Sequence, residues 1–310
     1  MPATRPAVGV LLVHGMGRQD ELEFGRDFIA AMPARLADRG VAPGAVAFRA
    51  GVWADVLNAR EDALFRDAED GGTLRWDGLR RFVVNALGDA VAYRRDDHPS
   101  DPAADRRPAD GAYALIHARI HAHLRALREV LGHDAPLVVV AHSLGAVIVS
   151  DYVWNARRPG NRHGVGAAAA EGTPFERADT LAGLITLGTT IPLFALALPR
   201  VLAIAPPRES PLLAPAVRAV AVWHNYYDPD DVLGWPLRTL ALDPTGAAPQ
   251  VAGEWSYRDA VEADHAVAAG GALTGWTPFV HTAYWHDAGV LDAAADQIAA
   301  VARAAVAPTA

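Results

Sequence analysis

The 310-residue chain contains no cysteine, so disulfides, zinc–thiolate sites and cysteine nucleophiles are excluded. Lysine and arginine total 28 against 36 aspartate and glutamate residues, a formal net charge of -8, and no long basic run interrupts that balance. Nucleic acid is therefore not an expected partner, because phosphate binding depends on clustered basic side chains. The first seven residues lack the apolar segment of a secretory signal, so we expect a cytoplasmic protein.

Long uninterrupted apolar runs are also missing. The longest apolar tract, residues 185–207, is broken by Pro192, Pro199 and Arg200, whereas a membrane-spanning helix needs about 20 consecutive apolar residues. This tract predicts either a core strand followed by a buried helix or an apolar cap over a pocket, at about residues 190–215. Transient contact with a membrane surface would be compatible with such a cap.

Apolar segments with strand and helix periodicity alternate along most of the chain. Strands are expected at 8–13, 45–52, 137–140, 181–187 and 216–223, and helices at 21–39, 111–131 and 288–306 and directly after residue 143. Pro33 is expected to bend or break the first helix. This alternation predicts an α/β fold, a mainly parallel doubly wound sheet with functional residues at the carboxyl edge of its strands.

The sequence predicts one domain, 1–310, that carries insertions. Residues 61–110 are charged and rich in turn-forming residues. Within them, residues 75–93 could form an amphipathic helix, and the Pro- and Asp-rich run at 96–110 is expected to be a mobile loop. We interpret this stretch as a helical insertion and not as a separate domain.

One stretch combines a buried-strand pattern with a tight turn around a serine. Residues 137–149 are LVVVAHSLGAVIV, in which the apolar run stops at Ser143 and resumes with helical spacing. A serine on such a turn exposes its hydroxyl at the sheet edge, and its neighbours must be small because the backbone turns sharply. The turn follows G-x-S-x-G with Ala141 in the first glycine position. Ser143 is therefore the candidate nucleophile, and an ordinary capping serine is the alternative.

A second informative turn follows the first expected strand, where VGVLLV leads into His14-Gly15-Met16-Gly17. Glycines allow such a loop to point a backbone amide toward a substrate held at the serine. The expected oxyanion hole consists of the amide of Leu144 and that of Met16 or Gly15. A plain glycine turn would explain the same pattern.

A serine hydroxyl needs a base within hydrogen-bond reach and a carboxylate that orients the base. In the chain order that this fold uses, the acid follows a later strand. Asp231 is the first choice in the segment NYYDPDDV, Asp228 is the alternative acid, and Asp230 ranks third. A solvated turn or a cation site would also account for these carboxylates.

The base is expected near the end of the chain, where three histidines are candidates. His281 is preferred because it lies in a loop among aromatic residues ahead of the last helix. His286 would lie at the N-terminus of that helix, where the dipole opposes a positive imidazolium. His265 lies in a segment of Ala and Gly that is expected to be less ordered. Each could instead be a surface or core histidine.

Three histidines in the helix at 111–131 raise the question of a metal site. His117 and His121 share a face, but Ala118, Arg119 and Ile120 between them do not supply the glutamate of H-E-x-x-H. We therefore expect a solvated or core-edge histidine pair, and no metal or cofactor.

The segments LLVHGMG, VVVAHSLGA, LITLGT, NYYDPDDV and HTAYWHD together resemble the α/β-hydrolase superfamily on its lipase and esterase side. They are most similar to the branch that includes bacterial lipase-like and GPI inositol-deacylase-like enzymes. The resemblance covers both ends and the centre of the chain, and leaves out residues 61–110 and 157–180. It implies Ser143 as nucleophile, Asp231 or Asp228 as acid, His281 as base, and an oxyanion loop at Gly15 and Met16.

The expected function is hydrolysis of carboxylic esters through an acyl-serine intermediate. The apolar tract favours a small-molecule ester with an apolar acyl or lipid-like group. Thioesters and amides are cleaved by the same triad, so a thioesterase or amidase is an alternative. A non-catalytic module of the same fold that binds a ligand or protein is the competing class.

Overall fold

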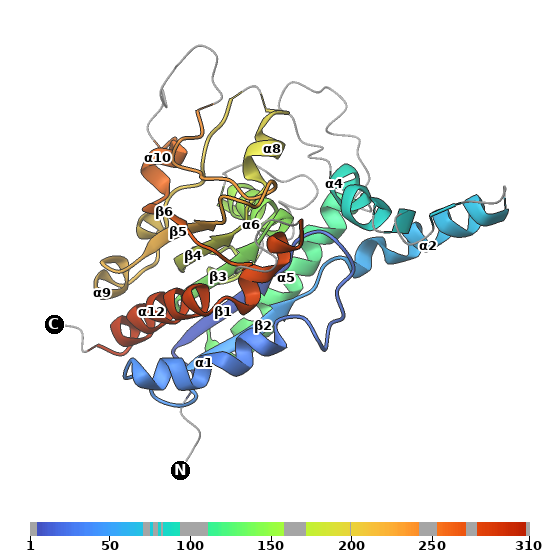
Figure 1. Ribbon diagram of the computed structural model, residues 1–310. Helices are drawn as coiled ribbons and strands as arrows, with labels where there is room; N and C mark the ends of the chain where they lie inside the picture. The colour runs from blue at the N-terminus through green and yellow to red at the C-terminus, as the bar shows by residue number, and fades with distance from the viewer. Residues whose placement is uncertain are drawn as a thin grey trace.

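The computed structural model describes residues 5–70, 75–76, 80–81, 83–93, 111–157, 172–198, 200–241, 253–270 and 278–307. The predicted α/β class is confirmed, because six parallel strands form one sheet in the order β2-β1-β3-β4-β5-β6 with helices on both faces (Figure 1). The strands are β1 (Val8–Val13), β2 (Val46–Gly51), β3 (Leu137–His142), β4 (Leu181–Leu187), β5 (Val222–Tyr227) and β6 (Ala263–Ala266).

The three strands β1, β3 and β4 form the middle of the core. Nearly every one of their residues is buried, as continuous apolar runs require in a sheet covered on both faces. The parallel register pairs Val13 of β1 with Ala141 of β3. The loops that leave these two strands, at residues 14–17 and at Ser143, therefore open at the same edge of the sheet.

Helices cover the sheet in two layers. One face carries α1 (Arg26–Asp38), α9 (Pro215–Arg218) and α12 (Ala288–Ala305), and the other carries α5 (Ala112–Leu131), α6 (Leu144–Arg157) and α8 (Ile191–Ala195) (Figure 1). Of the two expected effects of Pro33, a bend or a break, the break does not occur, since α1 runs through the proline. Phe28, Met32 and Leu36 are buried along one side of α1, and their packing stabilises the helix across the proline.

Two predictions near the far edge of the sheet are also wrong. The first part of the expected strand at 216–223 is helical, because Pro215 begins the short helix α9, and β5 starts only at Val222. Proline at a helix N-terminus already has the required φ angle, which explains the helical turn. The Ala-rich segment around His265, expected to be less ordered, forms β6 and pairs with β5.

The predicted insertion contains helices that project from the sheet. They are α2 (Asp55–Asp70), the π-helix η1 (Val84–Gly88) and α4 (Asp89–Ala92), and Figure 1 shows α2 extending away from the rest of the chain. We call these three elements the arm. The predicted helix at 75–93 is present in part as η1 and α4. The predicted mobile loop at 96–110 lies outside the described residues.

The apolar tract is partly core and partly surface. Its first residues complete β4, and α8 packs against α6 with Ile191 and Ala195 buried but Leu193 and Leu196 exposed. Ala203 then forms an antiparallel bridge with Trp255, near η3 (Pro207–Glu209) and α10 (Tyr257–Ala260). In the described part of the chain, no helix has the length and apolar character required to cross a bilayer.

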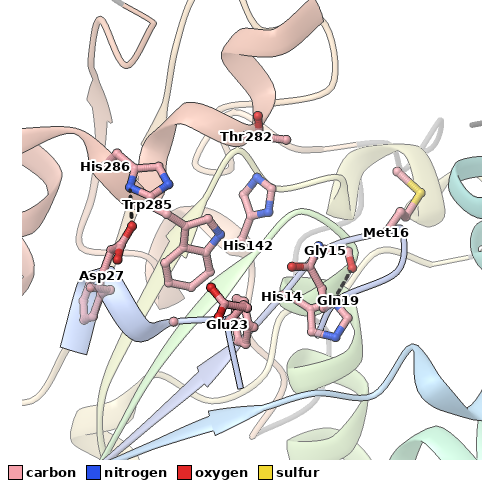
Figure 2. Close-up of a pocket in the computed structure, with 13 residues that line it drawn as sticks. His14, Gly15, Met16, Gln19, Glu23, Asp27, His142, Thr282, Trp285 and His286 are labelled. Atoms are coloured by element: carbon pink, nitrogen blue, oxygen red, sulfur yellow. Dashed lines mark hydrogen bonds and ion pairs between the residues drawn. The ribbon is translucent and has the colours of Figure 1, made fainter. Parts of the chain in front are cut away.

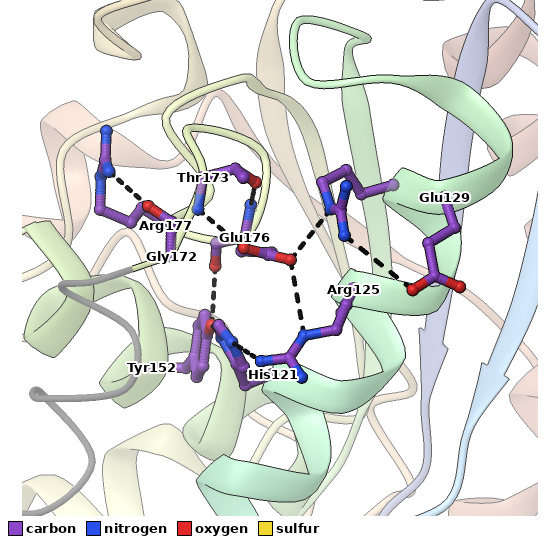
Figure 3. Close-up of polar contacts among 9 residues, drawn as sticks. His121, Arg125, Glu129, Tyr152, Gly172, Thr173, Glu176 and Arg177 are labelled. Carbon is purple, nitrogen blue, oxygen red and sulfur yellow. Dashed lines mark hydrogen bonds and ion pairs between the residues drawn. The ribbon is translucent and has the colours of Figure 1, made fainter.

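A buried carboxylate fixes the chain ahead of β4 (Figure 3). Glu176 accepts hydrogen bonds from the Thr173 amide at 2.7 Å and from Arg128 at 3.0 Å. The Tyr152 hydroxyl donates to the Glu176 carbonyl at 2.7 Å, so this loop is tied to α6 as well as to α5. Burial opposes ionisation of Glu176, but these hydrogen bonds and the nearby positive charges outweigh it and lower its pKa.

Candidate active site

Ser143 lies on a strained turn between β3 and α6. Its φ angle is 53°, in the left-handed region that few non-glycine residues occupy, and its amide donates to the Leu187 carbonyl at 2.9 Å. A Cβ atom at Gly145 would collide with the carbonyls of His14 and Val13, the latter at 2.8 Å. Backbone strain of this kind persists only where the surrounding contacts hold the residue in place, and it occurs most often at functional sites.

The structure brings Ser143, His281 and Asp231 together from three separate parts of the chain. The Nε2 atom of His281 lies 2.7 Å from Ser143 Oγ, and its Nδ1 atom lies 2.8 Å from Asp231 Oδ2. Because a carboxylate only accepts, Nδ1 carries the proton and Nε2 is free to accept the serine hydroxyl. His281 lies in the 3₁₀ segment η4 (Pro278–His286) and not in an open loop.

Asp231 is held in a fixed orientation by two further donors. The Leu233 amide donates to Oδ1 at 3.0 Å, and the Tyr284 hydroxyl donates to Oδ2 at 2.8 Å. Burial alone would raise the pKa of Asp231, but the hydrogen bonds from His281, Leu233 and Tyr284 outweigh it and hold the pKa below its ordinary value. Asp231 is therefore ionised beside the imidazole and stabilises a positive charge on it.

The other two carboxylates of the segment have different surroundings. Asp228 is buried, and its oxygens accept from the backbone amides of Asp230 at 2.9 Å and Ala269 at 2.7 Å. Asp230 is exposed. Asp228 therefore fixes loop structure, and of the three carboxylates it is Asp231 that contacts His281.

The two alternative histidines lie elsewhere. His265 on β6 pairs with His224, with 3.1 Å between Nε2 and Nδ1, and stacks on Tyr226. His286 is the last residue of η4 and lies 3.8 Å from a carboxylate oxygen of Asp27 at the surface. The N-terminus of α12 is capped instead by Asp287, whose side chain accepts from the Val290 amide.

The loop after β1 packs directly against Ser143. A Cβ atom at Gly15 would lie 2.6 Å from the Ser143 Cβ, so only glycine fits. The His14 imidazole donates from Nδ1 to the Gly15 carbonyl at 2.6 Å and accepts at Nε2 from the Trp53 amide at 3.1 Å. Burial lowers the pKa of His14 to about 3, so the ring stays neutral in this role.

These contacts leave backbone amides available beside the serine. Within the described residues, no hydrogen bond is donated by the amides of Gly15, Met16 or Leu144, so both candidates of the loop and the amide after the serine remain open to a ligand. Leu144 follows the serine at the first turn of α6, where N–H groups have no partner inside the helix and carry partial positive charge. The arrangement can therefore bind an oxyanion that forms on a carbonyl attacked by Ser143.

His142 is a member of the site that the sequence analysis did not single out. It is buried, and its Nε2 donates to the backbone carbonyl of His281 at 2.5 Å. Burial and the neighbouring His281 lower the pKa of His142 to about 3, so it is a neutral donor. His142 therefore fixes the backbone of the proposed base. Its place in the turn gave no signal of this, because the partner lies 139 residues away.

A cavity of about 260 Å³ opens beside these residues (Figure 2). Gly15, Met16 and His142 form one side of it, and the remainder comes from His14, the segment 19–25 ahead of α1, the first turn of α1, and η4. Phe24 and Phe28 pack edge-on against Trp285, with ring centroids 5.3 and 5.7 Å apart. The outer lining is polar and comprises Gln19, Glu23, Asp27, Thr282 and His286. The cavity reaches the triad through Gly15, which packs on Ser143, and His142, which binds the His281 carbonyl, and Ser143 and His281 themselves are not part of its lining.

The histidines of α5 do not form a metal site. All three are buried, so the predicted pair of His117 and His121 is not solvated. His117 contacts Tyr93 at 2.8 Å, His121 contacts Tyr152 at 3.0 Å, and His123 donates to the Val52 carbonyl at 2.9 Å. Among the residues that the structure describes, no group of three or more potential ligands could hold a metal ion.

The remaining question is whether known proteins share this site. No protein-family model and no curated protein sequence matches the chain. The roles of Ser143, His281 and Asp231 therefore rest on their geometry and chemistry.

Proposed function

We propose that this protein is a serine hydrolase that cleaves carboxylic esters through an acyl-serine intermediate. The observation that carries the proposal is the hydrogen-bonded chain from Ser143 through His281 to Asp231, with distances of 2.7 and 2.8 Å. A hydroxyl within hydrogen-bond reach of an imidazole that a carboxylate orients is an activated nucleophile. The arrangement of these three residues supports the competing hypothesis of a binding module less well, because ligand binding requires no such ordered proton path.

The proposed reaction has two halves. In the first, Ser143 Oγ attacks the ester carbonyl while His281 Nε2 takes the hydroxyl proton, and the Met16 and Leu144 amides bind the oxyanion. The tetrahedral intermediate then releases the alcohol, which receives that proton from His281. In the second half, His281 takes a proton from water as the water attacks the acyl-serine, and returns it to Ser143 as the acid leaves.

The substrate is proposed to be a small-molecule ester with an apolar acyl or lipid-like group. Support comes from the aromatic lining of the cavity and from the exposed apolar side chains Leu196 and Val232, which are 71% and 75% exposed. A cytoplasmic location with transient contact at a membrane surface belongs to the same proposal. Sedimentation with lipid vesicles tests the contact, and failure to cosediment would refute it.

A panel of p-nitrophenyl esters of increasing chain length tests the activity and the acyl preference together. We expect turnover by the wild type and a loss of kcat of at least about a thousandfold in Ser143→Ala. Thioester and anilide analogues of the best acyl group separate an esterase from a thioesterase or amidase. A kcat of Ser143→Ala equal to that of the wild type would refute the mechanism. Activity confined to acetyl esters would refute the apolar substrate.

A further inference from the structure

Carboxylates of the arm form hydrogen bonds and ion pairs with the loop that contains Met16. Asp89, at the start of α4, accepts the Gly17 amide at Oδ2 with a distance of 2.7 Å across 72 residues of sequence. Arg18 donates to Glu61 of α2 at 3.2 Å and to Asp62 at 2.5 Å. Two consecutive loop residues are thus bound to the arm.

The hydrogen bond between the Gly17 amide and Asp89 lies directly after Met16 in the chain. Met16 lies between two peptide planes. The plane on its amino side is fixed through the Gly15 carbonyl, which accepts from His14. The plane on its carboxyl side is fixed through the Gly17 amide, which donates to Asp89. The Met16 N–H lies in the first of these planes, so its direction is set through the Gly15 carbonyl, while the second plane limits how far the loop that carries this amide can shift.

Apart from the bonds of the neighbouring Arg18 to α2, little else restrains the loop at Gly17. Its φ angle is 96°, a conformation that glycine adopts without penalty, and a Cβ atom placed there would meet nothing within 4 Å. Side-chain packing therefore does not fix this residue. The restraint comes from the hydrogen bond to Asp89.

Asp89 is an unfavourable residue to bury for packing alone. It is 1% exposed, and burial is the main reason that its pKa is raised to about 7. Glu61 nearby adds repulsion and is only partly offset by Arg18. An apolar side chain would avoid this cost, which points to a role for the carboxylate as an acceptor.

We propose that Asp89 is a positioning residue for the oxyanion hole, and that the arm thereby forms part of the active site. It acts by holding the Gly17 amide, which fixes the peptide plane on the carboxyl side of Met16 and so limits movement of the loop that carries the Met16 amide. This inference rests on the proposed hydrolase function. It adds that catalysis depends on an element outside the segments that resemble known hydrolases.

Kinetics of Asp89 variants on the best p-nitrophenyl ester at pH 8 test the proposal. Asp89→Ala removes the acceptor, and we expect kcat to fall at least about tenfold with KM within about twofold, since a donor to the oxyanion acts mainly in the transition state. Asp89→Asn keeps an oxygen acceptor and is expected to retain kcat within about threefold. Asp67→Asn is the control and should match the wild type, because Asp67 is an exposed carboxylate of α2 that forms no bond to residues 14–18 among the described residues.

Hydrogen exchange provides a readout independent of activity. The Gly17 amide should be protected in the wild type and in Asp89→Asn, and should exchange at least about tenfold faster in Asp89→Ala. If Asp89→Ala does not fold, Asp89→Glu replaces it, because the additional methylene displaces the carboxylate. We expect its kcat to be lower than that of Asp89→Asn and its Gly17 amide to exchange faster.

The outcomes separate the two proposals. A folded wild type without turnover or fluorophosphonate labelling refutes the hydrolase function. An active wild type with a folded Asp89→Ala of unchanged kcat and unchanged Gly17 exchange refutes only the positioning role. Equal losses of kcat in Asp89→Asn and Asp89→Ala would also overturn it, because the acceptor would then not be what matters.

Discussion

Replacing Asp231 with asparagine tests how the proposed base is oriented. Both carboxylate oxygens accept hydrogen bonds, Oδ1 from Leu233 and Oδ2 from His281 and Tyr284. An asparagine amide group must therefore face a donor in either orientation. If it faces His281, the ring is driven to the tautomer with the proton on Nε2, which cannot accept the Ser143 hydroxyl.

Two magnitudes follow from this arrangement. The wrong tautomer lowers kcat by about 10⁴, the size found for the equivalent change in a triad of this kind. A buried donor left without an acceptor lowers the free energy of unfolding by about 1–3 kcal/mol. The loss of activity should therefore far exceed what the loss of stability explains at assay temperatures below the unfolding transition.

Asp228→Asn is the matched control, because Asp228 is also buried and also accepts two hydrogen bonds. We expect it to lose similar stability, about 1–3 kcal/mol, but to keep kcat within about threefold. Steady-state kinetics with a p-nitrophenyl ester and denaturant unfolding measure the two quantities. A folded Asp231→Asn with kcat near that of the wild type, or a larger catalytic loss in Asp228→Asn, would refute the assignment.

Three further predictions follow. Tyr284→Phe removes a donor to Asp231 and leaves the Asp228 amide without its 2.8 Å partner, so denaturant unfolding should show a loss of about 1–3 kcal/mol; an unchanged midpoint would contradict this. Gly145→Ala places a methyl group against the His14 and Val13 carbonyls, and should reduce fluorophosphonate labelling and the melting temperature together, whereas a wild-type labelling rate would show that the turn can relax. The raised pKa of Asp89, about 7 in the folded state against 3.8, means that the folded state binds the extra proton between pH 4 and 7, so the contribution of Asp89 to wild-type stability falls as pH rises through that window. The unfolding free energy of Asp89→Asn relative to wild type should rise by as much as about 4 kcal/mol over the same window, and a constant difference would show that the pKa is not raised.

Sequence patterns located the central strands because both faces of each are covered. Runs such as VGVLLV and LAGLITL contain no charged residue and a single polar side chain, Thr186, and their predicted limits agree with β1 and β4. β5 and β6 are less readable because their strands, VWHNYY and ADHA, carry polar residues whose partners are supplied by other strands and loops. Periodicity within one segment does not contain that information.

The candidate site was predictable where its signal is local. Ser143 and Gly15 lie in turns whose small residues reflect close backbone approach. The choice between Asp231 and Asp228 was not predictable from the sequence, because both lie in one short segment. Tertiary geometry shows which of them faces His281. The role of Asp89 likewise depends on a partner 72 residues away.

The measurement that tests the central claim most directly is intact mass after exposure to a fluorophosphonate probe, followed by peptide mapping. The proposal predicts stoichiometric labelling of the wild type at Ser143, at a rate that falls sharply in His281→Ala, and no adduct in Ser143→Ala. A well-folded wild type that remains unlabelled, or that is labelled equally fast without His281, would contradict the claim that His281 activates this serine.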